Sequence, residues 1–440
     1  ASSCIVSLPQ SIEGLKKYLG SGIIKGIGKV YAEKLVNMFG TAVLTTIEHT
    51  PEKLTQVPGI GPKRIEEITK GWQEQKHIAH IMVFLQEKGA SSSYATKIYK
   101  HYGTNAINVM TENPYRIAQE VWGIGFKTAD TIAQNLGFAP QSLARIKAGI
   151  LFAINQETNN GHLYVELDSL KELTTTLLEL DITTIKESLS NALYQLHHEK
   201  HIALITHKEK HYITLSKYYW IEKNIAKKIN DLLTYSIKTF NHNDCFSLLQ
   251  QTSAGSIELT EQQQEGILRA LEYRMSIITG GPGTGKTTLV KQLLKILDEK
   301  KLSYKLAAPT GRAAKRITES TGRYAVTLHR LLEFNPQTMG FTHNEQNALD
   351  LDFLIVDESS MIDVFLANSL LKALPLTAHV LFLGDIDQLP SVGAGNFLHD
   401  LIASKKIVTT RLKFIFRQAE NSLIAYNAHR VNHGNFPESQ

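Results

Sequence analysis

Apolar positions with helical spacing, separated by glycine turns, recur through the first third of the chain. The stretch "KGIGKVYAEKLVNMFG" at 25–40 places two glycines around an isoleucine and continues directly into an amphipathic helical pattern. The stretches "PGIGPKRIEEI" and "WGIGFKTADTIAQNLG" repeat it, and a weaker version starts at Gly89 without the second glycine. Units therefore begin at 26, 59, 89 and 123, a period of 30 to 34 residues. Such a period is typical of a repeated supersecondary element.

The units at 26 and 123 match each other best. Each has an alanine six residues after its first glycine and a further glycine fourteen residues after it. The unit at 59 has Ile65 at the sixth step and no glycine at the fourteenth, and the unit at 89 lacks its second glycine. We interpret the units at 59 and 89 as degenerate copies that pack against the other two.

Each glycine turn leads into a predicted helix start, where unpaired N–H groups and the helix dipole favour an anion. Cations in or beside the turns strengthen the prediction that they hold phosphates without reading bases. The alternative is a tight turn between packed helices, with lysines that are merely solvated. The units resemble helix-hairpin-helix motifs, which bind the DNA backbone. The predicted DNA contacts are Lys25, Gly26, Gly28, Lys29, Gly59, Gly61, Lys63, Gly123, Gly125 and Lys127.

The middle of the chain alternates helical patterns with one predicted β-hairpin. Residues 141–235 contain "SLARIKAGILFAINQ", "IKESLSNALYQLH" and "IALITHKEKHYITL", whose two apolar strands flank a basic turn. This order favours a winged-helix-like α+β segment. The wing could contact DNA or pack between domains, and the pattern favours neither. Residues 236–255 lose periodicity and are predicted to be a linker.

A strand, a glycine loop and a helix follow in "MSIITGGPGTGKTTLVKQLLKIL". Gly280, Gly285, Lys286 and Thr287 satisfy the P-loop pattern, whose backbone amides and lysine bind nucleotide phosphates. A chance match is the alternative, but the strand and helix are both in place. The predicted ATP contacts are Gly281, Pro282, Gly283, Thr284, Gly285, Lys286, Thr287 and Thr288.

The stretch "FLIVDESSMID" supplies an apolar strand that ends at Asp357 and Glu358. We expect this strand to neighbour the P-loop strand, so that Asp357 and Thr287 hold Mg²⁺. Glu358 would then orient or deprotonate the attacking water, and Lys286 would reach the β and γ phosphates. A surface acidic pair is the alternative. The predicted reaction class is nucleotide hydrolysis.

Composition narrows the class of protein only slightly. At 440 residues, 42% hydrophobic and 20% charged, the chain is expected to be globular with two to four domains. We find no long apolar run and no signal-peptide pattern, and two cysteines are too few for a disulfide framework, which predicts a cytoplasmic protein. Residues 1–140 carry 15 Lys+Arg against 11 Asp+Glu, or +4 of the net +5, which favours polyanion binding by the repeats.

Further motifs indicate which nucleotide hydrolase this is. "LAAPTGRAAKRITE", "AVTLHRLLEF", "VLFLGDIDQLPSVGAGN" and "LKFIFRQAENSLIAYNAHRVNHG" resemble motifs Ia, Ib, III and IV of superfamily 1 helicases. "LTEQQQEGI" resembles the adenine-reading Q motif, with Gln263 as its glutamine. With the helix-hairpin-helix repeats, this set is similar to the stand-alone RecD-type helicases, through nearly the whole chain.

The resemblance implies roles for residues that the local pattern leaves open. Gln388 would couple the γ-phosphate to the DNA path, and Arg417 would act as the arginine finger, although by pattern alone Arg417 could equally form a structural ion pair. The segment near 333–350, with a turn at Met339–Gly340, matches the family's strand-splitting pin. The residues implied to contact single-stranded DNA are Pro309, Thr310, Thr327 and His329.

The predicted organisation follows from these assignments. It comprises helix-hairpin-helix repeats at 1–140, the winged-helix-like segment at 141–235, the linker at 236–255, an α/β RecA-like P-loop domain at 256–410 and the start of a second RecA-like domain at 411–440. No counterpart of helicase motifs V and VI follows, and the chain begins without a methionine. We therefore expect a chain cut from something longer, which binds nucleotide and DNA weakly and does not unwind duplexes.

For the intact protein, the resemblance implies an ATP-dependent helicase that moves 5′ to 3′ on single-stranded DNA and acts at single-strand/duplex junctions in repair or recombination. The alternatives are a nucleotide-gated DNA-binding or loading module and the helicase part of a conjugative relaxase. The phosphate chemistry determines neither the direction of movement nor a preference for DNA over RNA. Helicases of both polarities use the same P-loop groups.

Overall fold

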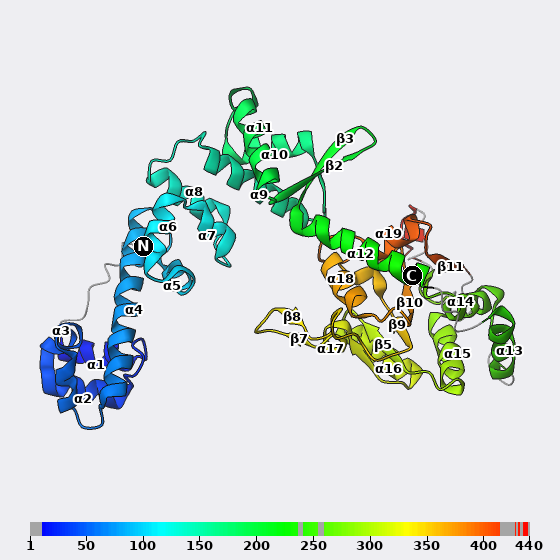
Figure 1. Ribbon diagram of the computed structural model, residues 1–440, viewed down its shortest axis with the longest axis horizontal. Helices are drawn as coiled ribbons and strands as arrows, with labels where there is room; N and C mark the ends of the chain where they lie inside the picture. The colour runs from blue at the N-terminus through cyan, green and yellow to red at the C-terminus, as the bar shows by residue number, and fades with distance from the viewer. Residues whose placement is uncertain are drawn as a thin grey trace. The chain divides into compact units, whose positions relative to one another are not determined.

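The computed structural model describes residues 11–235, 241–253, 259–413, 427, 430–431 and 434–438. The chain divides into two compact units (Figure 1). The N-terminal unit comprises 1–152 and 174–193, and the C-terminal unit comprises 153–173 and 194–440. The predicted segment 141–235 is shared between the two units, so the compact units do not coincide with a separate winged-helix-like domain there.

Helices joined by turns, without strands, make up the described residues of the N-terminal unit. Isoleucines at the glycine turns and apolar positions three and four apart on the helices meet in buried clusters. One cluster joins the first four helices, with Leu19, Leu35, Ile47, Ile68 and Trp72 among its members. The helices are α1 (Ile12–Gly20), α2 (Lys29–Phe39), α3 (Val43–His49), α4 (Pro62–Glu87), α5 (Ala95–Tyr102), α6 (Ala106–Glu112), α7 (Tyr115–Glu120), α8 (Phe126–Asn135) and the start of α9 (Leu143–Asn159).

The predicted hairpin is present. It lies near the start of residues 194–440, the longer segment of the C-terminal unit. Strands β2 (Ile202–His207) and β3 (Lys210–Leu215) pair antiparallel, and both loop residues, Lys208 and Glu209, have positive φ. A two-residue loop with positive φ at both positions matches the strand twist. A short strand, β1 (Val165–Glu166), adds to β3, and α12 (Ser216–Thr234) follows the hairpin. Two further helices, α10 (Leu167–Leu178) and α11 (Ile182–His198), precede it.

The predicted linker is wrong over most of its length, because α13 (His242–Ser253) forms there. Cys245, Leu248 and Leu249 lie three and four residues apart, and all three are buried in the core that surrounds the P-loop strand. The polar stretches on either side of the helix obscure this short apolar stripe in the sequence. Residues 242–253 therefore belong structurally to the P-loop domain.

The P-loop domain is built on a six-stranded parallel sheet with the order β11-β4-β10-β9-β5-β6. The expectation that the acidic strand neighbours the P-loop strand is wrong, since β10 lies between β4 and β9. Strand β11 also crosses the predicted boundary at 410/411. The strands are β4 (Met275–Gly280), β5 (Tyr304–Ala308), β6 (Ala325–Thr327), β9 (Phe353–Val356), β10 (His379–Gly384) and β11 (Val408–Leu412).

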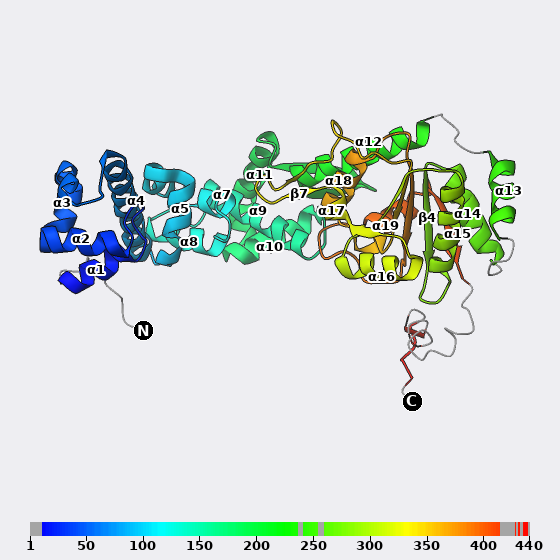
Figure 2. The ribbon, with the colours of Figure 1, turned by 90° about the horizontal axis from the view of Figure 1, so that it is seen from below.

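Helices cover both faces of this sheet, which explains why its central strands are apolar at successive positions. Ile278, Ile355 and Leu381 pack into the core formed with α13, α14 (Glu261–Glu272), α15 (Lys286–Glu299) and α16 (Gly311–Thr321). On the other face Phe382 contacts Phe397 of α19 (Phe397–Ala403), near α18 (Val364–Ala373). Figure 2 shows α14 and α15 on one side of β4 and α19 on the other.

The predicted pin is a short hairpin of β7 (Phe334–Asn335) and β8 (Gly340–Phe341), which follows the single-turn helix α17 (Leu328–Leu331). Its turn differs from the expected one, since Gly340 pairs with Asn335 within the hairpin. The turn therefore lies at 336–339, where Met339 has a φ of 51° and is 76% exposed.

The packing of helix α13 in the core can be tested by mutation. Leu249→Ala should lower the free energy of unfolding by about 2–4 kcal/mol, because it leaves a cavity against the helices that cover the sheet. The matched control is Phe246→Ala on the same helix, where the side chain is 43% exposed. Denaturant unfolding of both variants is the measurement. Equal, small losses would show that α13 does not pack in solution as it does here.

Candidate nucleotide and nucleic-acid site

The P-loop connects β4 to α15, and its first glycine occupies a crowded position. A Cβ at Gly280 would lie 2.8 Å from Thr284 Oγ1 and 2.9 Å from Leu412 Cβ. Gly283 and Gly285 have φ values of 79° and 81°, so the loop turns twice through conformations that glycine adopts readily. Gly285 caps α15, and the helix therefore starts with free N–H groups at the loop.

Lys286 lies at the start of α15 and turns back onto its own loop. Its Nζ donates to the carbonyl of Gly280 and, over 3.2 Å, to the carbonyl of Gly281. Burial lowers the pKa of Lys286, and the carboxylates of Asp385, Asp357 and Glu358 act in the opposite direction. These groups therefore share one electrostatic environment with the ammonium group that a nucleotide phosphate would contact.

The acidic pair follows β9 directly and lies at the same edge of the sheet as the P-loop. The Asp357 N–H donates to Ala307 O of β5 over 3.0 Å, and Asp357 Oδ1 accepts from the Glu358 N–H over 2.8 Å. Glu358 has a φ of 51° and a ψ of 41°, a left-handed conformation that costs energy for a residue with a side chain. Burial, followed by the nearby charge of Asp357, raises the pKa of Glu358.

Asp385 is a site residue that the sequence reasoning missed. It follows β10, is 4% exposed, and lies between the P-loop and acidic strands because β10 does. Its Oδ2 accepts from Gln388 Nε2 over 3.3 Å, and the next residue, Ile386, donates its N–H to Thr279 Oγ1 of β4 over 3.3 Å. An acid directly after an apolar strand, as at Asp357, was the signal that could have found it. Gln388 itself is exposed beside this edge.

Gln263 supports the P-loop from within the core. Its Oε1 accepts from the Thr260 N–H over 3.0 Å, while its Nε2 donates to the carbonyl of Thr284 over 3.3 Å. Its own N–H donates to Thr260 Oγ1, which completes a capping box at the start of α14. The side chain is fully buried, so in this structure its amide is used by the protein backbone. Recognition of adenine by Gln263 stays a prediction.

The donor set at this edge fits a magnesium nucleotide. Thr287 supplies an exposed hydroxyl at the start of α15, and the carboxylates of Asp357 and Asp385 are the oxygen ligands that Mg²⁺ prefers. The loop amides and Lys286 provide the donors that phosphates require. Neighbouring strands lie about 4.8 Å apart, so the tips of β4 and β9 are about 10 Å apart with β10 between them. A triphosphate with its metal spans a gap of that size.

The predicted contacts to single-stranded DNA lie farther along the same edge. Pro309 and Thr310 follow β5, while Thr327 ends β6 and precedes α17. Thr310 Oγ1 accepts from the Ala313 N–H and Thr327 Oγ1 accepts from the Arg330 N–H, at 3.3 and 3.2 Å. Each hydroxyl therefore caps a helix and keeps its own proton available for an acceptor such as a phosphate.

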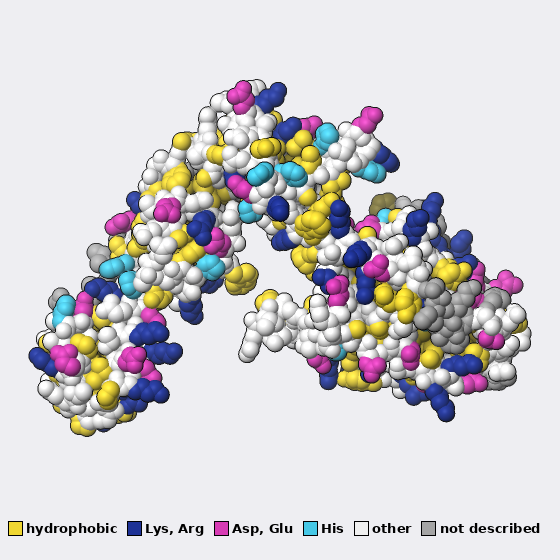
Figure 3. Space-filling model, in the orientation of Figure 1, with side chains coloured by type: hydrophobic (Ala, Val, Ile, Leu, Met, Phe, Trp, Pro, Cys, Tyr) yellow, Lys and Arg dark blue, Asp and Glu magenta, His cyan; other side chains and the backbone are white. Residues whose placement is uncertain are grey.

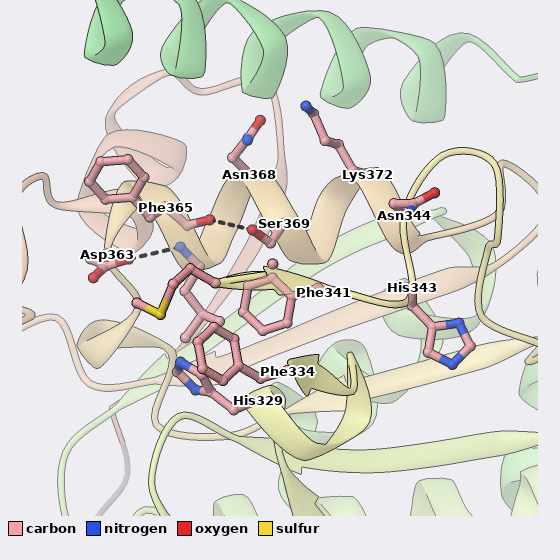
Figure 4. A pocket seen from close by; sticks show the side chains of 13 residues that line it. His329, Phe334, Phe341, His343, Asn344, Asp363, Phe365, Asn368, Ser369 and Lys372 are labelled. Carbon is pink, nitrogen blue, oxygen red and sulfur yellow. Dashed lines mark hydrogen bonds between the residues drawn. The ribbon is translucent and has the colours of Figure 1, made fainter. Parts of the chain in front are cut away.

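His329 joins this edge to the pin. Its ring centroid lies 5.8 Å from that of Phe334 and 5.6 Å from that of Phe341, and the two phenylalanines are 5.3 Å apart. Figure 4 shows these three rings side by side next to α18, where they line a cavity of about 470 Å³. Aromatic faces beside exposed polar groups are the chemistry that stacks unpaired bases.

The glycine turns of the N-terminal unit have a common geometry. Gly26, Gly59 and Gly123 have φ values of 91°, 92° and 86°, and the glycine two residues later caps α2, α4 or α8 in an extended conformation. The isoleucine between each pair of glycines is buried. The glycines themselves are exposed, except for Gly26, which is partly buried. Three helix N-termini are thus presented in the same way.

This geometry corrects the interpretation of the unit at 59 as degenerate. Its turn is complete, and the departures from the pattern lie in α4, which continues for 26 residues. Arg64 Nη1 donates to the Gly59 carbonyl over 2.8 Å, and its guanidinium lies 4.2 Å from the centre of the Tyr31 ring. The unit at 89 does differ, because Ser91 caps a 3₁₀ turn there and α5 starts only at Ala95.

Cations accompany the three complete turns. Lys29, Lys63 and Lys127 are exposed and occupy the first or second position of α2, α4 and α8, and Lys25 is exposed before Gly26. Figure 3 shows Lys and Arg side chains gathered along one edge of the lobe that contains α1–α4. Positive side chains beside free N–H groups form an anion site of the kind that the sequence predicts.

Arg417 and the rest of 414–426 lie outside the described residues, so the arginine-finger assignment stays a prediction. The start of a second RecA-like domain after Lys413 is likewise outside them, except for a few residues near the end of the chain.

The fold and the site define a P-loop nucleoside-triphosphate-binding protein that also carries helix-hairpin-helix turns. Family models agree: an AAA domain matches 263–394, a SAM-like helix-hairpin-helix tandem matches 21–74, and the helix-hairpin-helix domain of ATP-dependent RecD2 DNA helicases matches 74–164. The ATP-dependent RecD2 DNA helicase of Deinococcus radiodurans is 33% identical over 437 residues, which is 97% of this chain. The chain is therefore similar, over nearly all of its length, to the ATP-dependent RecD2 DNA helicases.

Other relatives match shorter parts of the chain. The RecBCD enzyme subunit RecD of Haemophilus influenzae is 38% identical over 39% of this chain and 31% of its own length. A crystal structure of the Pif1 helicase from Candida albicans is 24% identical, covers 41% of this chain and 46% of that chain, and has a TM-score of 0.32. The chain spans 59% of the length of the Deinococcus relative.

Of the helices in the described part of the chain, none combines the length and the apolar composition needed to cross a membrane.

The crowding at Gly280 predicts the effect of a single methyl group. Gly280→Ala should weaken binding of a fluorescent ATP analogue by about tenfold or more, at least about 1.4 kcal/mol, because the added Cβ displaces the P-loop. Gly311→Ala is the control, since a Cβ there meets nothing within 4 Å and Gly311 is not among the predicted ATP contacts. Circular dichroism would verify that both variants fold. Equal affinities in the two variants would contradict the role assigned to Gly280.

The three equivalent lysines predict a salt effect. Replacing Lys29, Lys63 and Lys127 together by Ala should reduce the slope of log affinity against log salt concentration by about 2 to 3 on duplex DNA of unrelated sequences. Fluorescence anisotropy measures this slope, and Lys17→Ala, an exposed cation at the end of α1, is the single-charge control. An unchanged slope in the triple variant would assign the DNA contacts to another surface.

Proposed function

We propose that the protein is a DNA helicase that hydrolyses ATP with Mg²⁺ and moves 5′ to 3′ along single-stranded DNA in repair or recombination. One observation carries the proposal: the ends of β4, β10, β9, β5 and β6 bring nucleotide-binding groups and predicted DNA contacts to one edge of one sheet. Chemistry at the phosphates can therefore act on the groups that hold the nucleic acid. The family resemblance supports the polarity.

The nucleotide chemistry is assigned to residues along this edge. The loop amides and Lys286 bind the β and γ phosphates, for which Lys286 must leave the carbonyls that it contacts here. Thr287 and Asp357 would hold Mg²⁺, which would supply positive charge beside the phosphates. Glu358 orients the attacking water or accepts its proton, and its raised pKa brings its basicity closer to that task. Gln388 senses the γ-phosphate from its place beside Asp385, and Arg417 serves as the arginine finger.

The DNA is assigned to two surfaces. A single strand would contact Pro309, Thr310, Thr327 and His329, and the pin beside His329 would divide the strands of a duplex at a junction. The helix-hairpin-helix turns would hold phosphates elsewhere on the same nucleic acid, with contacts that are sensitive to salt and indifferent to sequence. The proposed substrate is therefore a junction between single-stranded and duplex DNA.

A substitution at the proposed water-activating residue tests the reaction. Glu358→Gln should keep ATP binding within about threefold of the wild type but lower hydrolysis and strand displacement by about 100-fold or more, because the amide cannot accept the proton. Glu299→Gln, an exposed acid at the end of α15, is the control. Retained strand displacement in Glu358→Gln would contradict the helicase proposal. Loss of hydrolysis with ATP-dependent DNA binding as the main activity would favour a nucleotide-gated binding module.

Polarity requires its own experiment, since the phosphate chemistry does not determine it. Duplexes with either a 5′ or a 3′ single-stranded tail should be offered to the chain and, if it is part of a longer protein, to that protein. We expect displacement from the 5′-tailed duplex. Displacement restricted to the 3′-tailed duplex would overturn the proposed direction.

A further inference from the structure

Arg316 lies on α16 and reaches toward the acidic end of β9. Its Nη1 is 3.5 Å from Glu358 Oε1, with the Arg316 side chain 67% exposed and the Glu358 side chain 15% exposed. Arg316 also belongs to the charges that act on Lys286, whose pKa it lowers after the larger effects of burial and the three acids. Its guanidinium therefore contacts Glu358, and its charge acts on the Lys286 ammonium group that a nucleotide phosphate would contact.

The other charged groups near Glu358 do not replace its contact with Arg316. Asp357 and Asp385 are like charges, and Lys286 is held by the carbonyls of its own loop. Among the described residues, the ion pair of Glu358 is the one with Arg316. A carboxylate that is bound to a guanidinium and held in a left-handed backbone conformation is less free to turn toward a water molecule.

Helix α16 connects Arg316 to the predicted DNA contacts. The helix is capped by Thr310, which follows Pro309 at the end of β5. Strand β5 pairs with β9 so that Ala307 lies opposite Val356, and Ala307 O accepts from the Asp357 N–H over 3.0 Å. A strand of DNA that binds Pro309 and Thr310 thus contacts the start of the helix whose second turn carries Arg316.

We propose that Arg316 is a positioning residue that couples nucleic acid to ATP hydrolysis. Without DNA, Arg316 holds Glu358 and restrains it. Binding of single-stranded DNA at Pro309 and Thr310 shifts α16, and the guanidinium then leaves Glu358 for the phosphates. The inference rests on the proposed function, because it assigns the same Glu358 and the same DNA path. A contact that is this exposed is weak and suits a switch, since a small movement breaks it.

The test compares ATP hydrolysis with and without single-stranded DNA. Arg316→Ala should raise the DNA-free rate by about three- to tenfold and leave the rate at saturating DNA within about twofold, so that the stimulation by DNA falls. Arg316→Lys, which keeps the charge, should retain most of the stimulation. Lys315→Ala is the matched control, because Lys315 is an exposed cation on the same helix that pairs with Glu319. A DNA-free rate that stays at the wild-type value, or equal losses with and without DNA, would overturn the proposal.

A second measurement separates this inference from the proposed function. If the wild-type chain hydrolyses no ATP even with DNA, the proposed function fails in this chain, but the contact can still be tested by binding. A double-mutant cycle of Arg316→Ala and Glu358→Gln should give affinities for a fluorescent ATP analogue that depart from additivity by about two- to fivefold. Additive effects would show that the two side chains do not interact and would overturn the inference directly.

Discussion

The hydrogen-bonded register of β4, β10, β9 and β5 sets the distances among the groups of the nucleotide site. Gly384 lies opposite Thr279, Phe382 opposite Val356, and Ala307 opposite Val356 on the other side. Because all of these strands are parallel, their carboxyl ends meet at one edge, where open α/β sheets place their ligands. A slip of one residue in any pair would exchange the side chains that face the two helical layers, and the packing on both faces would be lost. The core on both faces therefore maintains the site.

Several features of this edge could be predicted from sequence because local chemistry specifies them. The P-loop has a fixed spacing of glycines, lysine and threonine, and Asp357 follows four apolar residues. The matching geometry of the glycine turns at 26, 59 and 123 likewise follows from a backbone conformation that glycine adopts readily. What pattern analysis misjudged was the turn at 59, because the prediction weighted the helix after the turn, and helix positions tolerate changes that the turn does not.

Other features depend on contacts between distant segments. The order of the strands is decided by which helices cover which face of the sheet. No local sequence pattern therefore predicts that β10 lies between β4 and β9. Its position after an apolar strand was a local signal for Asp385, but the strand order is what places Asp385 between the P-loop and Asp357. Arg316 is one of several cations on α16, and only the distance to Glu358 distinguishes it from Lys315. Helix α13 was missed because its buried stripe is short and polar residues surround it.

The side-chain amide of Gln263 supports both a helix start and the phosphate loop. The same side chain closes the first turn of α14 and holds the carbonyls that shape the phosphate loop. Evolution at this position is consequently constrained from two directions, because a replacement that loosens the loop also frays the helix before it. Heat tolerance and nucleotide affinity should therefore drift together among natural variants at this position, and selection for either one would preserve the other.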